Sequence, residues 1–379
     1  MSHPARPTHG FSLVELMVAM VIGLVLTLTI STMVARQESV RRGVTSGNDL
    51  TSNSAYASYL LDRELRSAGA GFSQAVASNY GCILHASRNA AQLLPATAAF
   101  PAPFAAIPQD YRLAPAMVFA GAGAGGSDVI AVATGHSGLS ETALPVSPGT
   151  AAPGQVKLSN TLGMRGGDLV LVAQDGLAEC MLQQVSAGFV GGTAEILTFG
   201  GAFTADVVAG VALADFAIGN TNVSLLGNAT GNQPRLQLLG IGANNTLFSY
   251  DLLQLTAGAQ ALAEGIVDMR VRYGVDSAPK DGTVDAWIAP TSAGYTAAAL
   301  RDGSATSRDN LQSILSLRVG LVLRSDLVDK TDVTQPTLTL FDTLPAAQQH
   351  TFTVPAGTAT QRYRTVEFTV PLRNVRYSR

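Results

Sequence analysis

The clearest pattern in the chain is an apolar segment near the N-terminus, which runs from Phe11 to about Ala35. Residues 16–26, LMVAMVIGLVL, contain no polar side chain, and the only charge in the whole segment is Glu15. As a helix, residues 11–34 would reach roughly 36 Å, which is enough to cross a bilayer. We therefore predict that residues 11–35 form a membrane-spanning helix.

Beyond this segment the apolar positions take on the three-and-four spacing of a helix with one buried face. The spacing predicts that the helix continues over residues 36–70 as an amphipathic segment. Glycines and short polar residues at 43–49 weaken its centre, so we expect a bend or a frayed turn there. The glycines of 69–71 are expected to end the helix. The spaced apolar residues are Val40, Val44, Leu61, Leu65 and Ala68.

From residue 116 the pattern changes to short apolar runs separated by Gly and Asn clusters, which predicts β-strands. No long helical pattern intervenes, so an antiparallel arrangement is favoured. Residues 72–115 give a poor pattern and are expected to form irregular loops. The fold class is therefore α+β, with a long N-terminal helix packed on a large antiparallel β-rich head over 71–379. We expect strands at 116–120, 128–134, 168–173, 180–185, 194–199, 223–226, 235–239, 246–253, 266–273, 313–323 and 364–372.

Composition adds little direction. Charged residues make up 13% of the chain and the net charge is −3, which gives no overall attraction to nucleic acid or anionic membranes. The C-terminal segment RYRTVEFTVPLRNVRYSR, residues 362–379, is rich in Arg and could in principle contact DNA. A final strand with arginines on its exposed face is the favoured interpretation.

The two cysteines, Cys82 and Cys180, are too few for a four-ligand zinc site. If the head is exported, a disulfide between them is favoured. The alternative is two unrelated buried thiols.

Three other features of the sequence are candidates for ligand binding or catalysis. Residues 121–126 contain a literal G-x-G-x-x-G, but a strand-like run follows where a dinucleotide site needs a helix, so a hairpin is predicted. Asp276, Asp281 and Asp285 are weak candidates for a calcium site, although Lys280 and the spacing favour a solvated turn. The five histidines are scattered and read as loop residues. We predict no enzyme activity, no cofactor and no metal.

The stretch GFSLVEL, residues 10–16, resembles the processing signal of type IV prepilins and pseudopilins. The resemblance implies that residues 1–10 are a leader. A prepilin peptidase would cut between Gly10 and Phe11 and methylate the new amino group of Phe11. Glu15 would then be an assembly residue whose carboxylate meets the Phe11 amine of a neighbouring subunit. Many major pilins have a proline that kinks the helix at the position of Thr32. This chain has no proline there, so the sequence predicts no such kink.

Further segments resemble minor pilins of the PilW family. This similarity implies a pilin-like fold and a minor pilin that joins other minor pilins and a tip adhesin to prime assembly at the pilus tip. Such a protein would sit in the inner membrane with one span and a periplasmic head, contact an assembly platform, and later enter the pilus. It would support twitching motility, adhesion or DNA uptake, without binding nucleic acid itself. The alternatives are a minor pseudopilin of a type II secretion system and an adhesive tip-binding module. The similar segments are LLDRELRSAGAGF (60–72), EGIVDMRVRYGVD (264–276), DGTVDAW (281–287), SLRVGLVLRSD (316–326) and FTVPLRN (368–374).

Overall fold

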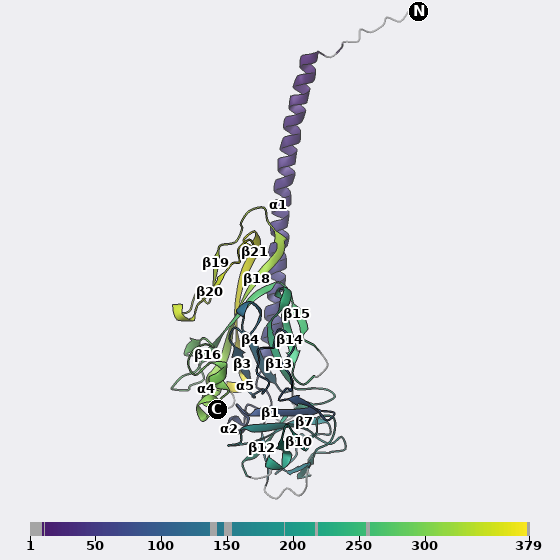
Figure 1. Ribbon diagram of the computed structural model, residues 1–379, viewed down its shortest axis with the longest axis vertical. Coiled ribbons are helices and arrows are strands. Elements are labelled where there is room, and N and C mark those ends of the chain that lie inside the picture. The colour runs from purple at the N-terminus through teal and green to yellow at the C-terminus, as the bar shows by residue number, and fades with distance from the viewer. Residues whose placement is uncertain are drawn as a thin grey trace, which may run out of the picture.

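One long helix carries a β-rich head, and the N-terminal half of the helix projects beyond the head (Figure 1). This arrangement is the α+β, pilin-like organisation that the sequence predicts. The computed structural model describes residues 10, 12–136, 142–147, 154–192, 194–216, 219–254 and 258–376.

The helix α1 spans Leu13–Arg66 without interruption, so the break expected around residues 43–49 is absent. Ser12 begins it with a capping box, and Ser67 follows its last turn. Gly69 then adopts φ +82°, a left-handed conformation that glycine tolerates best, and its N–H donates to the Ala133 carbonyl of the head. The chain thus leaves the helix three residues before the first predicted glycine and turns directly into the head.

A six-stranded sheet lies at the end of the head farthest from the exposed helix (Figure 1). Its strand β7 (Asp168–Gln174) alternates between two hydrophobic cores. Leu169 and Leu171 face the main core of the head, whereas Val170 and Val172 face a second core at the far end. The spatial order is β2 (Ala91–Leu94), β1 (Ile83–Arg88), β8 (Glu179–Gln184), β7, β12 (Thr221–Asn228) and β5 (Leu144–Pro145).

Two further sheets pack against the C-terminal half of α1. The five-stranded sheet has the order β15 (Gln260–Ala263), β14 (Leu247–Asp251), β13 (Arg235–Ile241), β4 (Val129–Thr134) and β3 (Ala116–Phe119). The four-stranded sheet has the order β17 (Ala286–Ile288), β16 (Ile266–Val275), β18 (Ile314–Val328) and β21 (Gln361–Pro371). All of their pairings are antiparallel in the described residues.

Strand β18 is central in its sheet and is covered on both faces. Leu317, Val319 and Leu321 point into the main core, and Val322 points into a small core beneath the hairpin of β19 (Thr337–Leu340) and β20 (His350–Thr353). Gly320 is required on that second face, since a Cβ atom there would lie 2.9 Å from the Phe341 ring. This confirms the strand expected at residues 313–323.

The remaining elements are short. They connect the sheets and close the ends of the head. They are α2 (Val76–Asn79), α3 (Ala297–Leu300), α4 (Ala305–Ser313), α5 (Arg373–Arg376), the 3₁₀ turns η1 (Ala124–Gly126), η2 (Leu213–Phe216), η3 (Ala243–Asn245) and η4 (Ala346–Gln348), and the pairs β6 (Gln155–Lys157) with β9 (Ile196–Thr198) and β10 (Val207–Val208) with β11 (Val211–Ala212).

Each strand expected from the sequence is present, but the expectation for residues 72–115 was wrong in part. The strands β1 and β2 form there, and β1 pairs in parallel with β8, with Leu84 opposite Cys180. The sequence pattern could not reveal β1, because its partner lies almost a hundred residues later in the chain. The head is therefore not wholly antiparallel.

Candidate assembly site

The exposed half of α1 presents apolar side chains on all sides. Leu13 is 75% exposed, Leu24 69% and Met33 71%. By length and composition α1 qualifies as a membrane-crossing helix, since its most apolar 18-residue window has a mean hydropathy of 2.5 and none of that window is buried. Such a surface needs lipid or other apolar helices around it.

The threonine hydroxyls of this half-helix donate to carbonyls of the same helix. The Thr27 hydroxyl donates to the Gly23 carbonyl at 2.7 Å, and the Thr32 hydroxyl donates to the Thr29 carbonyl at 2.9 Å. These hydroxyls therefore do not need water as a hydrogen-bond partner. The segment therefore tolerates an apolar environment despite its late threonines.

Glu15 occupies the first turn of α1, where its carboxylate completes the capping box. The Ser12 N–H donates to Glu15 Oε2 at 2.9 Å, and the Glu15 N–H donates to Ser12 Oγ at 3.2 Å. A negative charge is favoured at this position, because the helix dipole and the free N–H groups are positive there. Gly10 is exposed just before the cap, and Phe11 lies outside the described residues.

The second half of α1 is fastened to the head by packing and by polar contacts. Its buried face includes Leu50, Ala57, Leu61 and Leu65, of which Leu65 is completely buried. Polar contacts reinforce this seam. They are Arg364 Nη1 to Thr51 Oγ1 at 2.6 Å, Arg235 Nη1 to Glu64 Oε1 at 3.3 Å, and Asn374 Nδ2 to the carbonyls of Ser67 and Ala68 at 3.1 Å each.

The face of this half that turns away from the head is partly apolar as well. Val40 is 67% exposed and Val44 58%, while Tyr56 and Tyr59 are 54% and 61% exposed. These residues extend the apolar surface of the first half along the outer side of the head. The two tyrosines were not singled out from the sequence, because only the structure shows which helical face the head leaves uncovered.

Two family models match the chain. The prokaryotic N-terminal methylation motif covers residues 6–31, which include Gly10 and Glu15. The model for type IV pilus-assembly protein W covers residues 227–374, which correspond to β13 through β21. Together, the two matches support a type IV pilus minor pilin of the PilW family. Comparison with curated proteins finds no match for this pilin, and comparison with solved structures finds none either.

This pilin has its cysteines in a disulfide. Cys82, just before β1, and Cys180 in β8 are joined with a Cα–Cα distance of 5.7 Å. Both residues are buried, at 3% and 0% exposure. The bond fastens the parallel β1–β8 pairing into the main core.

The carboxylates considered for calcium accept hydrogen bonds from backbone N–H groups. Asp276 accepts from the Gly282 N–H at 2.7 Å, Asp281 from the Thr283 N–H at 2.9 Å, and Asp285 from the Ser277 N–H at 2.7 Å. Among the described residues, no group of three or more His, Cys, Asp and Glu side chains is arranged to hold a metal ion. The hairpin predicted at 121–126 is present between β3 and β4.

Two histidines predicted in loops lie on strands and face carboxylates. His85 Nε2 lies 2.6 Å from Glu179 Oε2, and His350 Nε2 lies 3.0 Å from Asp268 Oδ2. His136 does lie in a loop, whereas His3 and His9 are outside the described residues. The sequence could not pair these residues, because each partner is more than eighty residues away.

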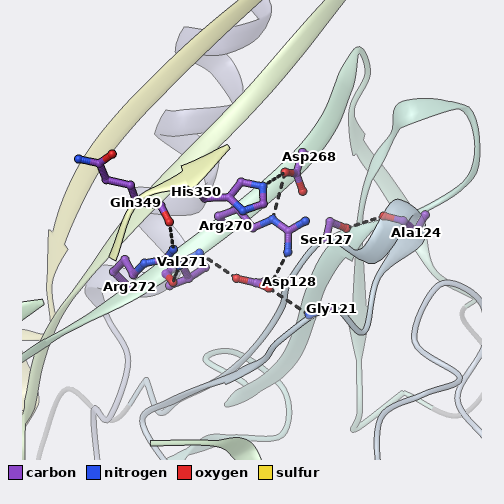
Figure 2. A network of polar contacts seen from close by, with 10 residues as sticks. All are labelled: Gly121, Ala124, Ser127, Asp128, Asp268, Arg270, Val271, Arg272, Gln349 and His350. Carbon is purple, nitrogen blue, oxygen red and sulfur yellow. Dashed lines mark hydrogen bonds and ion pairs between the residues drawn. The ribbon is translucent and has the colours of Figure 1, made fainter. Parts of the chain in front are cut away.

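A buried polar network, which the sequence did not predict, joins three parts of this pilin (Figure 2). Arg270 lies 3.6 Å from Asp128 and 3.0 Å from Asp268, and Asp128 also accepts from the N–H groups of Gly121 and Val271. Arg272 Nε donates to the Gln348 carbonyl at 2.7 Å, so the β19–β20 hairpin is included. Burial raises the pKa of Asp128, although its hydrogen bonds and the arginines oppose that rise.

The signal for this network was present in the sequence. Asp268, Arg270 and Arg272 alternate along β16, which marks one face of that strand as charged. Two of the arginines near the C-terminus also have partners. Arg362 lies 3.0 Å from Asp329, and Arg364 contacts α1. These contacts support the interpretation of a final strand rather than a DNA-binding strip.

Proposed function

We propose that this pilin is a minor pilin that is anchored in the inner membrane by residues 11–35 and then joins other minor pilins through the same helix to prime a type IV pilus, at or near its tip. The observation that carries the proposal is an exposed apolar half-helix with a single carboxylate at its start. In lipid, that surface is solvated by acyl chains. In a fibre, it is solvated by the helices of neighbouring subunits.

In this proposal the processing peptidase removes residues 1–10 and frees the amino group of Phe11. Glu15 then exchanges its capping contact with Ser12 for the Phe11 ammonium of a neighbour. The exchange neutralises two charges in an apolar setting, so a wrongly placed neighbour leaves a buried charge unpaired. Glu15 thereby sets the axial position of each subunit.

The role is structural rather than catalytic, and both family models point in that direction. The match to a pilus-assembly protein favours a pilus over a type II secretion system. The large head on a single helix suits a subunit present in few copies. The proposed partners are other minor pilins, a tip adhesin, the prepilin peptidase and the inner-membrane assembly platform.

The test uses two substitutions that separate charge from capping. Glu15→Gln retains a side chain that accepts from the Ser12 N–H but has no charge, whereas Glu15→Ala loses both functions. Leaving one partner of a buried ion pair alone costs about 3–5 kcal/mol, which is on the order of a hundredfold or more in incorporation. Loss of the cap alone costs about 1 kcal/mol.

Incorporation is measured by immunoblot of sheared pili, and insertion by the membrane fraction. Glu38→Gln is the matched control, because Glu38 lies on the same helix beyond the apolar segment. We expect normal insertion of all three variants, and strongly reduced incorporation of both Glu15 variants. Wild-type incorporation of Glu15→Gln would refute the assembly role of the charge.

A further inference from the structure

The head reaches back along α1 to the point where the apolar segment ends. The described ends of β18 and β21 and the segment that follows β18 lie beside the helix at its emergence from the head (Figure 1). A small cleft is formed between this part of the head and the helix. It is lined by Ala35, Glu38 and Arg42 from α1 and by Val328, Asp329 and Lys330 from the head.

The segment at this position, residues 327–333, exposes apolar side chains. Val328 is 55% exposed, Leu327 40% and Val333 38%. Among the described residues that follow β10 in the chain, the exposed large apolar side chains are these three and Val284. We call residues 327–333, which are the last two residues of β18 and the turn after it, the collar loop.

The length of the helix gives the position of the collar loop relative to the bilayer. A bilayer has a hydrocarbon core of about 30 Å, which corresponds to about 20 helical residues. A span that begins near Leu13 therefore reaches the far side of the core close to Val34. Ala35 and Glu38, which share the cleft with the collar loop, then lie in the headgroup layer.

We propose that, before assembly, the collar loop rests in the headgroup region of the bilayer and inserts Leu327, Val328 and Val333 there. The ligand is a lipid surface, and the contact is apolar. The proposal rests on the membrane span proposed above. It adds that the head is seated on the membrane rather than held away from it, so the orientation of the helix axis is fixed by two contacts instead of one.

The charges around the collar loop nearly cancel. Glu38 and Arg42 form an ion pair on the helix at 3.1 Å, and Asp329 pairs with Arg362 at 3.0 Å. The remaining charges of these two segments are Asp326, Asp332 and Lys330 of the head and Arg36 and Arg41 of the helix, which sum to +1. An apolar surface with so small a net charge enters the headgroup layer by the hydrophobic effect and does not require anionic lipid.

The experiment places a fluorescent label on the full-length pilin in nanodiscs of phosphatidylcholine. The native cysteines are buried in a disulfide, so a thiol-reactive label attaches to an added cysteine only. Val328→Cys carries the label in the collar loop. A second nanodisc preparation contains lipids with a nitroxide near the glycerol end of the acyl chain, which quenches labels at the membrane surface.

Two controls use the same label. Val190→Cys reports on a site that is 80% exposed and pairs with Arg165 near the far core. Leu24→Cys reports on the middle of the apolar segment and is tested with a nitroxide deep in the acyl chain. Quenching at Leu24 establishes the span independently, so a failure of the span and a failure of the collar contact are distinguishable.

We expect the label at Val328 to lose about half of its emission or more, because interfacial apolar groups lie roughly 5–10 Å into the headgroup boundary. High salt should leave this loss unchanged. Emission from Val190 should change little. Quenching at Leu24 but not at Val328 would overturn the proposal. A water-shielded but unquenched label at Val328 would also overturn it, since a second protein would then cover the collar loop. A lack of quenching at Leu24 would overturn the membrane span as well.

Discussion

Loss of the Cys82–Cys180 disulfide should destabilise the head substantially. The two residues are separated by 98 positions in the sequence. In the chain-entropy model, a closed loop of that length raises the free energy of unfolding by about 4–5 kcal/mol, because the unfolded chain loses conformational freedom. The bond also fastens β1 to β8, a parallel pair whose strands lie far apart in the sequence. The effect should therefore fall on the main core rather than on the helix.

The measurement is urea denaturation of the purified pilin in detergent, followed by tryptophan fluorescence and far-UV circular dichroism. The wild type is compared in oxidising and reducing buffer with a double variant, Cys82→Ala with Cys180→Ala. We expect the variant and the reduced wild type to lose about 3–5 kcal/mol relative to the oxidised wild type. The variant itself should not respond to reductant, which makes it the control for other effects of the buffer. A loss below about 1 kcal/mol would refute the reasoning, because the disulfide would then contribute little to the free energy of unfolding.

Two further predictions concern the helix seam and the buried network. Leu61→Ala, at a position that is 1% exposed, should lower the free energy of unfolding by about 2–5 kcal/mol. Tyr59→Ala, at 61% exposure, should change it by about 0.5 kcal/mol or less. Equal effects of the two substitutions in urea denaturation would contradict the assignment of the buried face. The raised pKa of Asp128 means that its contribution to stability is fully present below the ordinary value of 3.8 and is lost as the pH rises through the folded-state pKa. The stability of the wild type relative to Asp128→Asn should therefore fall between acidic and neutral pH, and a difference that grows with pH in the same denaturation assay would disprove this sign.

Several features of this pilin followed from local pattern alone. The apolar segment predicted the exposed half-helix, because a helix that is apolar on all sides over this length is stable only in lipid or among other apolar helices. The strand at 313–323 was predicted from its run of apolar residues. The hairpin at 121–126 was predicted from the strand-like residues on either side of its glycines.

Other features were out of reach, since they depend on residues far apart in the chain. Strand β1 is fixed by β8, and His350 is placed by Asp268. The helix also remains unbroken past Gly43 and Gly47, where local propensity predicts weakness. Packing of Leu50 and the following turns on the head outweighs the helical penalty of about 1 kcal/mol for each glycine.

The sequence by itself determined the processing motif, the apolar half-helix with its one acid, and a β-rich head, because each is a property of consecutive residues. Only the tertiary structure decided which face of α1 the head covers and that the collar loop lies beside Ala35. These depend on how distant strands pack around one helix, and the chain folds into that arrangement through contacts that no local spacing encodes.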